Sequence, residues 1–306
     1  MKRLVAALLA ILTVGFPVGY LVLGQKGMVS FERKEVLLLY GALLAVLVAV
    51  SLLAVLLGRG HFDSRPRPAR ALGGAVKLCG VLAIAVGIAS VLLQFVQGYV
   101  SIGQLGYSLF GALMGVGLLG AGQFIGRGGP GGLSPAVLLV VVWTGFSLVL
   151  LIAGKAVSPY LPQRVLDFLT SCAGSFLFLQ VCYTFTGEFT ARRARAAIGW
   201  GWRTLVLGAV AYLPNLVRQM LNGGPFELLA MLSLATHLLF LAAVLAVTLW
   251  YMGAFDRSME RVGPRHGGQR PEEEDAAAKD EHRSPEKGRY VYRPRRAGSA
   301  PRRLRR

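Results

Sequence analysis

Four polar side chains that could do chemistry, Asp167, Ser171, Ser233 and His237, stand inside long apolar runs. Asp167 and Ser171 are four residues apart, as are Ser233 and His237, so each pair lies on one face of a helix. Ionisable groups at membrane depth are costly and usually face the interior of a helix bundle. The spacing therefore predicts polar helix faces turned into a bundle, where they either line a hydrated pathway or tie helices together by hydrogen bonds.

A further polar segment, from Pro214 to Arg218, interrupts the apolar run 204–221 and contains Asn215. Proline lacks an N–H and its ring opens a helix, so Pro214 predicts a helix break that leaves a carbonyl group without its partner. In membranes such breaks tend to line cavities, because a freed carbonyl needs water or a side chain. Arg218 could anchor an anionic group, or it could pair with Glu227 at the surface.

These segments predict a polar cavity in the outer half of the bundle, formed by the helices of runs 165–185, 204–221 and 228–251. Its candidate lining residues are Asp167, Ser171, Asn215, Arg218, Ser233 and His237. The alternative is a packed kink whose hydrogen bonds are all satisfied. Alanine at a functional position would alter transport or binding, whereas alanine in a packed kink would reduce only stability.

Motifs for catalysis or for metal binding are absent from the sequence. There is no HExxH, no CxxC and no nucleophile elbow, and His237 stands apart from the other three histidines. Gly115-Val-Gly117-Leu-Leu-Gly120 matches a dinucleotide fingerprint in letters, but it lies within an apolar run without a preceding strand. The sequence therefore predicts no metal site and no cofactor, and it favours a protein that is not an enzyme.

The glycine-rich run 103–122 predicts close helix packing. Gly111 and Gly115 form a pair of small residues four apart, which lets two helix backbones approach each other. We expect this helix to be central in the bundle rather than to face lipid.

The elements that must position these residues are apolar runs of about 20 residues, the length that crosses a bilayer as a helix. They occur at 4–23, 36–57, 78–96, 103–122, 136–153, 165–185, 204–221 and 228–251. The chain is 54% hydrophobic and 16% charged, far more apolar than a soluble domain. The fold class predicted is all-α, a polytopic transmembrane bundle of about eight spans over residues 1–255.

Basic residues set the orientation, because Lys and Arg in short loops resist translocation. With the N-terminus inside, the inner positions of residues 1–255 hold 12 Lys and Arg and the outer positions hold 6. The segments 58–77 and 186–203 and the tail are then cytoplasmic, and 25–34, 155–164 and 222–226 are external. Both termini are inside.

The tail, residues 256–306, has few apolar residues and carries 15 Lys and Arg against 9 acids. It cannot bury enough surface to offset chain entropy, so we expect it to be disordered. Its last 14 residues form a basic cluster that could bind anionic lipid headgroups. The arginines of this cluster are Arg293, Arg295, Arg296, Arg302, Arg303, Arg305 and Arg306.

Together these features predict a multi-pass protein of a bacterial cytoplasmic membrane, the bacterial source being indicated by 26 Arg against 7 Lys. The function favoured is a small-solute permease or the membrane subunit of a transport complex with protein partners, because buried polar residues suit a bundle with a path through it. The alternatives are a scaffolding protein that recruits partners through its tail and an intramembrane enzyme acting on lipid. No specific nucleic-acid partner is expected.

Overall fold

The computed structural model describes residues 2–27, 33–58, 62–63, 67–98, 100–129, 131–153, 162–221 and 228–255. The predicted tail, 256–306, lies outside the described residues, together with its arginine cluster. The described part is helical and contains no strand. The all-α fold class is therefore confirmed for this part of the chain.

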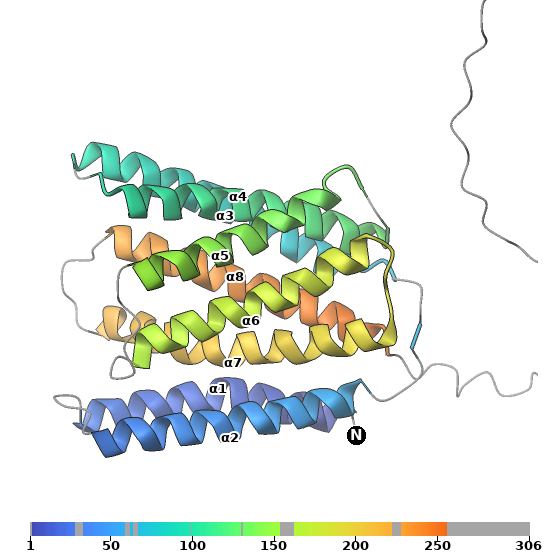
Figure 1. Ribbon diagram of the computed structural model, residues 1–306, viewed down its shortest axis with the longest axis horizontal. Coiled ribbons are helices and arrows are strands. Elements are labelled where there is room, and N and C mark those ends of the chain that lie inside the picture. Colours follow the sequence, from blue (N-terminus) through green and yellow to red (C-terminus); the bar gives the residue numbers. More distant parts are fainter. Residues whose placement is uncertain are drawn as a thin grey trace, which may run out of the picture. The chain divides into compact units, whose positions relative to one another are not determined.

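Each of the eight apolar runs corresponds to a helix (Figure 1). The helices are α1 (Lys2–Gly27), α2 (Arg33–Leu57), α3 (Arg70–Val96), α4 (Ile102–Arg127), α5 (Leu138–Ala153), α6 (Pro162–Phe185), α7 (Ala191–Leu221) and α8 (Leu228–Gly253), and a 3₁₀ turn, η1 (Ser134–Val137), precedes α5. Within the described residues, seven helices are long and apolar enough to cross a membrane, and α1 adds the shorter apolar stretch Val5–Gly19. The number of spans and their orientation stay predictions.

Two helices begin well before the apolar runs that predicted them. Helix α3 begins at Arg70 rather than 78, and α7 begins at Ala191 rather than 204. Most of the segment 186–203 is thus helix and not the loop that we expected. The reason is that hydropathy marks the apolar part of a helix, whereas the backbone hydrogen bonds continue into the polar residues beyond it.

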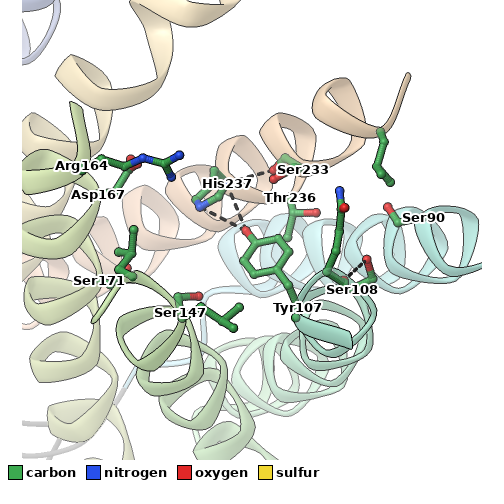
Figure 2. A pocket seen from close by; sticks show the side chains of 15 residues that line it. Ser90, Tyr107, Ser108, Ser147, Arg164, Asp167, Ser171, Ser233, Thr236 and His237 are labelled. Carbon is green, nitrogen blue, oxygen red and sulfur yellow. Dashed lines mark hydrogen bonds between the residues drawn. The ribbon is translucent and has the colours of Figure 1, made fainter. Parts of the chain in front are cut away.

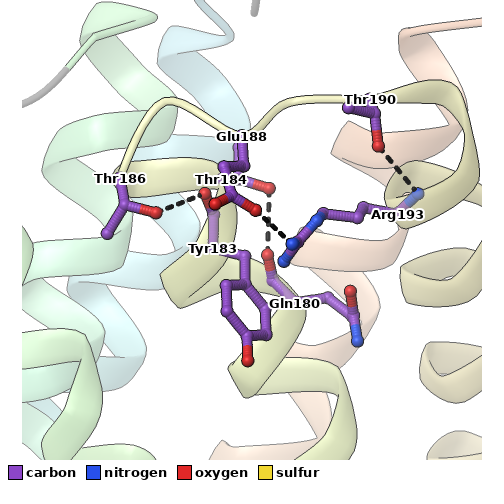
Figure 3. A network of polar contacts seen from close by, with 7 residues as sticks. All are labelled: Gln180, Tyr183, Thr184, Thr186, Glu188, Thr190 and Arg193. Atoms are coloured by element: carbon purple, nitrogen blue, oxygen red, sulfur yellow. Dashed lines mark hydrogen bonds and ion pairs between the residues drawn. The ribbon is translucent and has the colours of Figure 1, made fainter.

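The turn between α6 and α7 stabilises this early start (Figure 3). Gly187 adopts a left-handed φ of 92°, which reverses the chain after α6. The hydroxyl of Thr190 accepts a hydrogen bond from the backbone N–H of Arg193 at 3.4 Å, as an N-cap does. Glu188 forms an ion pair with Arg193, which offsets the unfavourable placement of a cation in the first turn of a helix.

Six helices form a closed ring in which each packs against the next: α3, α4, α5, α6, α7, α8 and again α3. Helix α4 also contacts α8 across the ring, so it has neighbours on several sides. The ring has two ends. One, which we call the cavity end, is where α3 and α5 end and α4, α6 and α8 begin.

The α1–α2 hairpin packs on the outside of this ring, against α7 (Figure 1). Two arginines of α7 hold it there. Arg195 Nε donates to the backbone carbonyl of Gly58 at 3.0 Å, and the guanidinium of Arg203 donates twice to the hydroxyl of Ser51, at 2.9 and 3.0 Å. Arg203 also lies over the ring of Trp200, 4.6 Å from its centroid.

Helices α3 and α4 approach each other most closely, along glycines that repeat every seven residues. These are Gly73, Gly80 and Gly87 on α3, and Gly115 and Gly122 on α4. A Cβ atom at Gly80 would lie 2.7 Å from the carbonyl oxygen of Gly115, and one at Gly115 would lie 2.6 Å from that of Gly80. The two backbones are therefore in direct contact, which only glycine allows.

Candidate functional site: a polar cavity in the helix ring

A cavity of ≈ 460 Å³ opens at the cavity end, between α3, α4, α5, α6 and α8 (Figure 2). Its volume lies in the range of small-molecule sites, about 300–1,000 Å³. Most of the residues that line it have polar side chains, together with Gly103, Leu150, Leu151 and Leu229, although apolar atoms contribute the larger part of the lining surface. The polar lining residues lie in the last few turns of α3 and α5 and in the first few turns of α4, α6 and α8.

Four of the six candidates from the sequence line this one cavity: Asp167, Ser171, Ser233 and His237. They come from α6 and α8, whose first turns both lie at the cavity end. The side chains of the other two, Asn215 and Arg218, lie outside the described part of the structure.

The predicted helix break at Pro214 does not end α7. The helix continues through Pro214 to Leu221. Neither Pro214 nor any other residue of α7 is among the residues that line the cavity. Helix α7 contributes instead through the Tyr212 side chain, which lies behind Asp167 and His237.

Most of the lining comes from helices that the sequence did not associate with the site. The additional polar residues are Ser90, Gln104, Tyr107, Ser108, Ser147, Arg164 and Thr236. One signal for them exists in the sequence. Gln94 stands seven residues after Gly87, and Ser108 stands seven before Gly115, so the glycine register of α3 and α4 continues into polar residues. The register holds, because Gln94 Nε2 donates to Ser108 Oγ at 3.2 Å.

His237 is held as a neutral imidazole by two hydrogen bonds. Its Nδ1 lies 2.9 Å from the carbonyl oxygen of Ser233, which can only accept, so Nδ1 carries the proton. The hydroxyl of Tyr107 lies 3.1 Å from Nε2 and 3.2 Å from Nδ1, and with the proton on Nδ1 it can donate to Nε2. The Ser233 side chain is in turn hydrogen-bonded to Tyr107. Both imidazole nitrogens are therefore engaged, as expected of a structural histidine in a bundle.

Aromatic rings surround the imidazole. The centroid of His237 lies 4.3 Å from that of Tyr212, 5.7 Å from that of Trp143 and 5.8 Å from that of Tyr107. Rings at these distances pack favourably and fix one another in place. His237 is therefore packed within a cluster of three aromatic rings.

Asp167 has one satisfied and one free oxygen. The hydroxyl of Tyr212 donates to its carboxylate. The Oδ1 atom is buried without a hydrogen-bond partner. Arg164, one turn earlier on α6, lies beside Asp167 with its own side chain exposed (Figure 2). A buried oxygen without a partner is costly, and because the Asp167 side chain lines the cavity, water or a ligand that reached this carboxylate would relieve the cost.

Four hydroxyls in the lining donate hydrogen bonds to backbone carbonyls of their own helices. Each donates to the backbone carbonyl four residues earlier, at 2.8–3.0 Å. The pairs are Ser90 with Val86, Ser108 with Gln104, Ser147 with Trp143, and Thr236 with Leu232. Such hydroxyls present oxygen lone pairs to the cavity and have no proton left to donate.

A layer of buried aromatic side chains closes the cavity away from its mouth. Trp143, Phe178 and Phe240 are each at most 2% exposed. The ring centroids of Trp143 and Phe240 are 5.1 Å apart, and those of Phe178 and Phe240 are 5.8 Å apart. Gly174 makes room for this layer, because a Cβ atom there would lie 2.6 Å from Phe240 Cζ.

The acid and the histidine of the cavity lining are Asp167 and His237. Among the described residues, no three His, Cys, Asp or Glu side chains lie close enough together to hold a metal ion. Asp167 and His237 are each bonded to a tyrosine, so the groups that titrate are anchored in the wall. The lining combines hydroxyl oxygens and one carboxylate with the guanidinium of Arg164, the amide of Gln104 and three leucines.

The chain matches no protein-family model, no curated protein and no solved structure. Function therefore has to follow from the cavity and from the helices that carry it. These helices are compatible with a membrane protein by their length and composition.

Proposed function

We propose that the protein binds a small polar solute in this cavity, as a permease or as the membrane subunit of a transport complex. The observation that carries the proposal is the buried, unpartnered Oδ1 of Asp167 at a cavity of ≈ 460 Å³ inside a ring of apolar helices. Buried polar atoms without a partner are uncommon in native proteins, and of the five among the described residues Asp167 Oδ1 is the one whose side chain lines this cavity.

The grouping of polar residues favours this function over a scaffold. In a scaffold, hydrogen bonds between helices would satisfy the buried polar groups where they stand, and no space would be needed. The bond from Ser175 Oγ to Thr144 Oγ1, 2.7 Å long, is of that kind and lies away from the cavity lining. Asp167, Ser171, Ser233 and His237 instead share one open volume.

The aromatic layer supports transport rather than binding alone. Trp143 and Phe240 lie one turn beyond Ser147 and His237, directly under the cavity. A solute that entered at the mouth would have to pass this layer to reach the other end of the bundle. Movement of the layer would expose the site to the second side, as alternating access requires.

Water access to the cavity tests the first step. In a variant whose three native cysteines are replaced by alanine, Ser171→Cys would react with a small membrane-impermeant thiol reagent. The control is Thr204→Cys, since Thr204 is 0% exposed and does not line the cavity. Equal protection of both positions in the folded protein would show that the cavity is closed and dry, and the proposal would be dropped.

Transport tests the second step. Full-length protein in liposomes would be compared with empty liposomes for uptake of a panel of amines, amino acids, sugars and organic anions. We expect uptake of at least one class, and loss of that uptake in the cavity-filling variant Ser171→Trp. If Asp167→Ala and His237→Ala lower the folded yield and no panel member is taken up by any form, the cavity is architecture and the protein is not a permease.

The setting of this function is a proposal of the same kind. The excess of Arg over Lys supports a bacterial source, and the basic segments support a cytoplasmic membrane with both termini inside. In that orientation the cavity end faces outward, so the cavity would receive solute from outside the cell. Cell fractionation with an antibody to the tail would check the membrane assignment.

A further inference from the structure

We infer that the solute carries a protonated primary amine, and that the ammonium group binds between Asp167 and the serine and threonine oxygens of the cavity. This inference rests on the proposed function, because it names the chemical class of the ligand for the same site. It follows from three features of the lining: the direction of its hydrogen bonds, its one buried carboxylate and its aromatic wall.

The hydrogen bonds make the lining rich in acceptors. Ser90, Ser108, Ser147 and Thr236 have each donated their only proton to a backbone carbonyl. A hydroxyl oxygen keeps its acceptor lone pairs in that state. The lining also holds N–H donors, on Arg164 and Gln104, but a ligand with several N–H groups would find acceptors on four helices, α3, α4, α5 and α8. An ammonium group brings three such donors and no acceptor.

The carboxylate provides the charge. Tyr212 satisfies one side of Asp167, and the buried Oδ1 has no partner. A neutral hydroxyl ligand could donate to the carboxylate, but it would add no positive charge to the compensation that the exposed Arg164 gives Asp167. A cation gains both the hydrogen bond and the Coulomb attraction, which is stronger in a protein interior than in water.

The groups that face Asp167 from other elements do not compete for this role. His237 is neutral, with both nitrogens bonded, and Tyr212 acts as a donor to the other side of the carboxylate. Arg164 is the cation among the described lining residues, and its side chain is exposed. Its charge opposes a bound cation, which makes the effect of removing it a test of the inference.

The aromatic wall agrees with a positive ligand. The aromatic side chain that lines the cavity is Tyr107, whose ring centroid lies 5.8 Å from that of His237. Aromatic faces attract cations, most strongly when water is excluded. This attraction does not need N–H groups, so it can be separated from hydrogen bonding by comparing a primary with a quaternary ammonium ion.

The experiment is calorimetric titration of the full-length protein in lipid nanodiscs, in an amine-free phosphate buffer of low ionic strength. The probes are ethanolamine, choline, ethylene glycol and acetate. Ethanolamine should bind, and ethylene glycol and acetate should bind at least about tenfold more weakly because they lack the positive charge. Choline should also bind more weakly than ethanolamine, by about threefold or more, since it has no N–H donor.

Three variants make the result specific. Asp167→Asn keeps an acceptor for Tyr212 and should weaken ethanolamine binding at least about tenfold. Arg164→Gln should strengthen it by about threefold, because a repelling charge is removed. The control Glu188→Gln removes an acid of the α6–α7 turn, remote from the lining, and should leave the affinity unchanged.

The outcomes separate the two claims. Binding of ethylene glycol or acetate as strongly as ethanolamine, or an unchanged affinity in Asp167→Asn, overturns the ammonium inference and leaves the solute cavity standing. Weaker ethanolamine binding in Arg164→Gln would also overturn it, since Arg164 would then be part of the attraction. If no probe binds, and the panel of sugars, amino acids and organic anions gives no signal, the proposed function itself fails.

Discussion

The hydroxyl of Tyr107 on α4 lies 3.1 Å from Nε2 of His237 on α8, although 130 positions separate the two residues in the chain. This bond crosses the ring of helices. It fixes the tautomer of His237, because the other nitrogen donates to the carbonyl of Ser233. The cavity wall on this side is thus held by one polar contact between helices that are not consecutive.

Removal of this contact should reduce stability. Tyr107→Phe keeps the ring but leaves Nε2 of His237 buried without a donor, which costs about 1–3 kcal/mol. The free energy of unfolding in detergent would measure the loss. The control is Tyr183→Phe, since the Tyr183 side chain is exposed and its ring still stacks on Arg193. Equal stability of the two variants would contradict the role given to the Tyr107 hydroxyl.

Gly115 and Gly111, which the sequence pairs as packing residues, should respond differently to alanine. A Cβ atom at Gly115 would lie 2.6 Å from a backbone oxygen of α3, whereas one at Gly111 would lie 3.5 Å from Thr236 Cγ2, an ordinary contact. Gly115→Ala should therefore destabilise the protein by about 1–3 kcal/mol, as overpacking does. Gly111→Ala should be close to neutral. Thermal unfolding in one detergent would compare them, and similar midpoints would disprove the close α3–α4 contact.

The orientation predicted from the basic residues can be tested with single cysteines at exposed turns. In the cysteine-free background, Val100→Cys should react with an impermeant reagent in intact cells. Thr186→Cys should react only after permeabilisation. Both positions are exposed, whereas Ala194 in the arginine block is fully buried and would be a poor probe. Reaction of Thr186→Cys in intact cells would reverse the topology.

The basic cluster of the tail, residues 293–306, remains a candidate for binding anionic lipid. Seven of its fourteen residues are arginine, and each is worth about 1 kcal/mol near an anionic leaflet at low salt. A peptide of this sequence should co-sediment with vesicles that contain phosphatidylserine, and added salt should release it. A peptide with the seven arginines replaced by glutamine is the control. Failure to bind at low ionic strength would leave the cluster as a topology signal only.

The sequence predicted the helices and part of the site for a physical reason. Each helix carries about one bilayer thickness of apolar residues, so the runs locate all eight. Asp167 and His237 both line the cavity, and α6 and α8 both begin at the same end of the bundle. Helices that alternate in direction begin at the same end of the bundle when they are two apart in the chain. The order of the helices therefore places the starts of α6 and α8 at one end without any knowledge of packing.

The rest of the cavity could not be predicted in this way. Whether α3 or α4 lies beside α8 depends on how the helices pack. The order of the apolar runs along the sequence does not determine which helices become neighbours. Tyr107 and Ser147 stand in apolar runs, where a hydroxyl can equally bond its own helix and face lipid. Ser147 does bond its own helix, and it lines the cavity as well. The seven-residue spacing of glycines on α3 and α4, which continues to Gln94 and Ser108, is a sequence pattern that could have indicated the α3–α4 side of the cavity.

The attachment of the α1–α2 hairpin to α7 has a consequence for biosynthesis. Ser51 meets Arg203, which follows it by 152 positions, and Gly58 meets Arg195, which follows it by 137. Because the chain is made from its N-terminus, the hairpin leaves the ribosome long before its partner helix exists. If both of its helices span the membrane, as the sequence predicts, the pair has to persist in lipid without α7 while four more helices are added. A ribosome stalled before residue 190 would carry a hairpin that is already inserted but not yet docked.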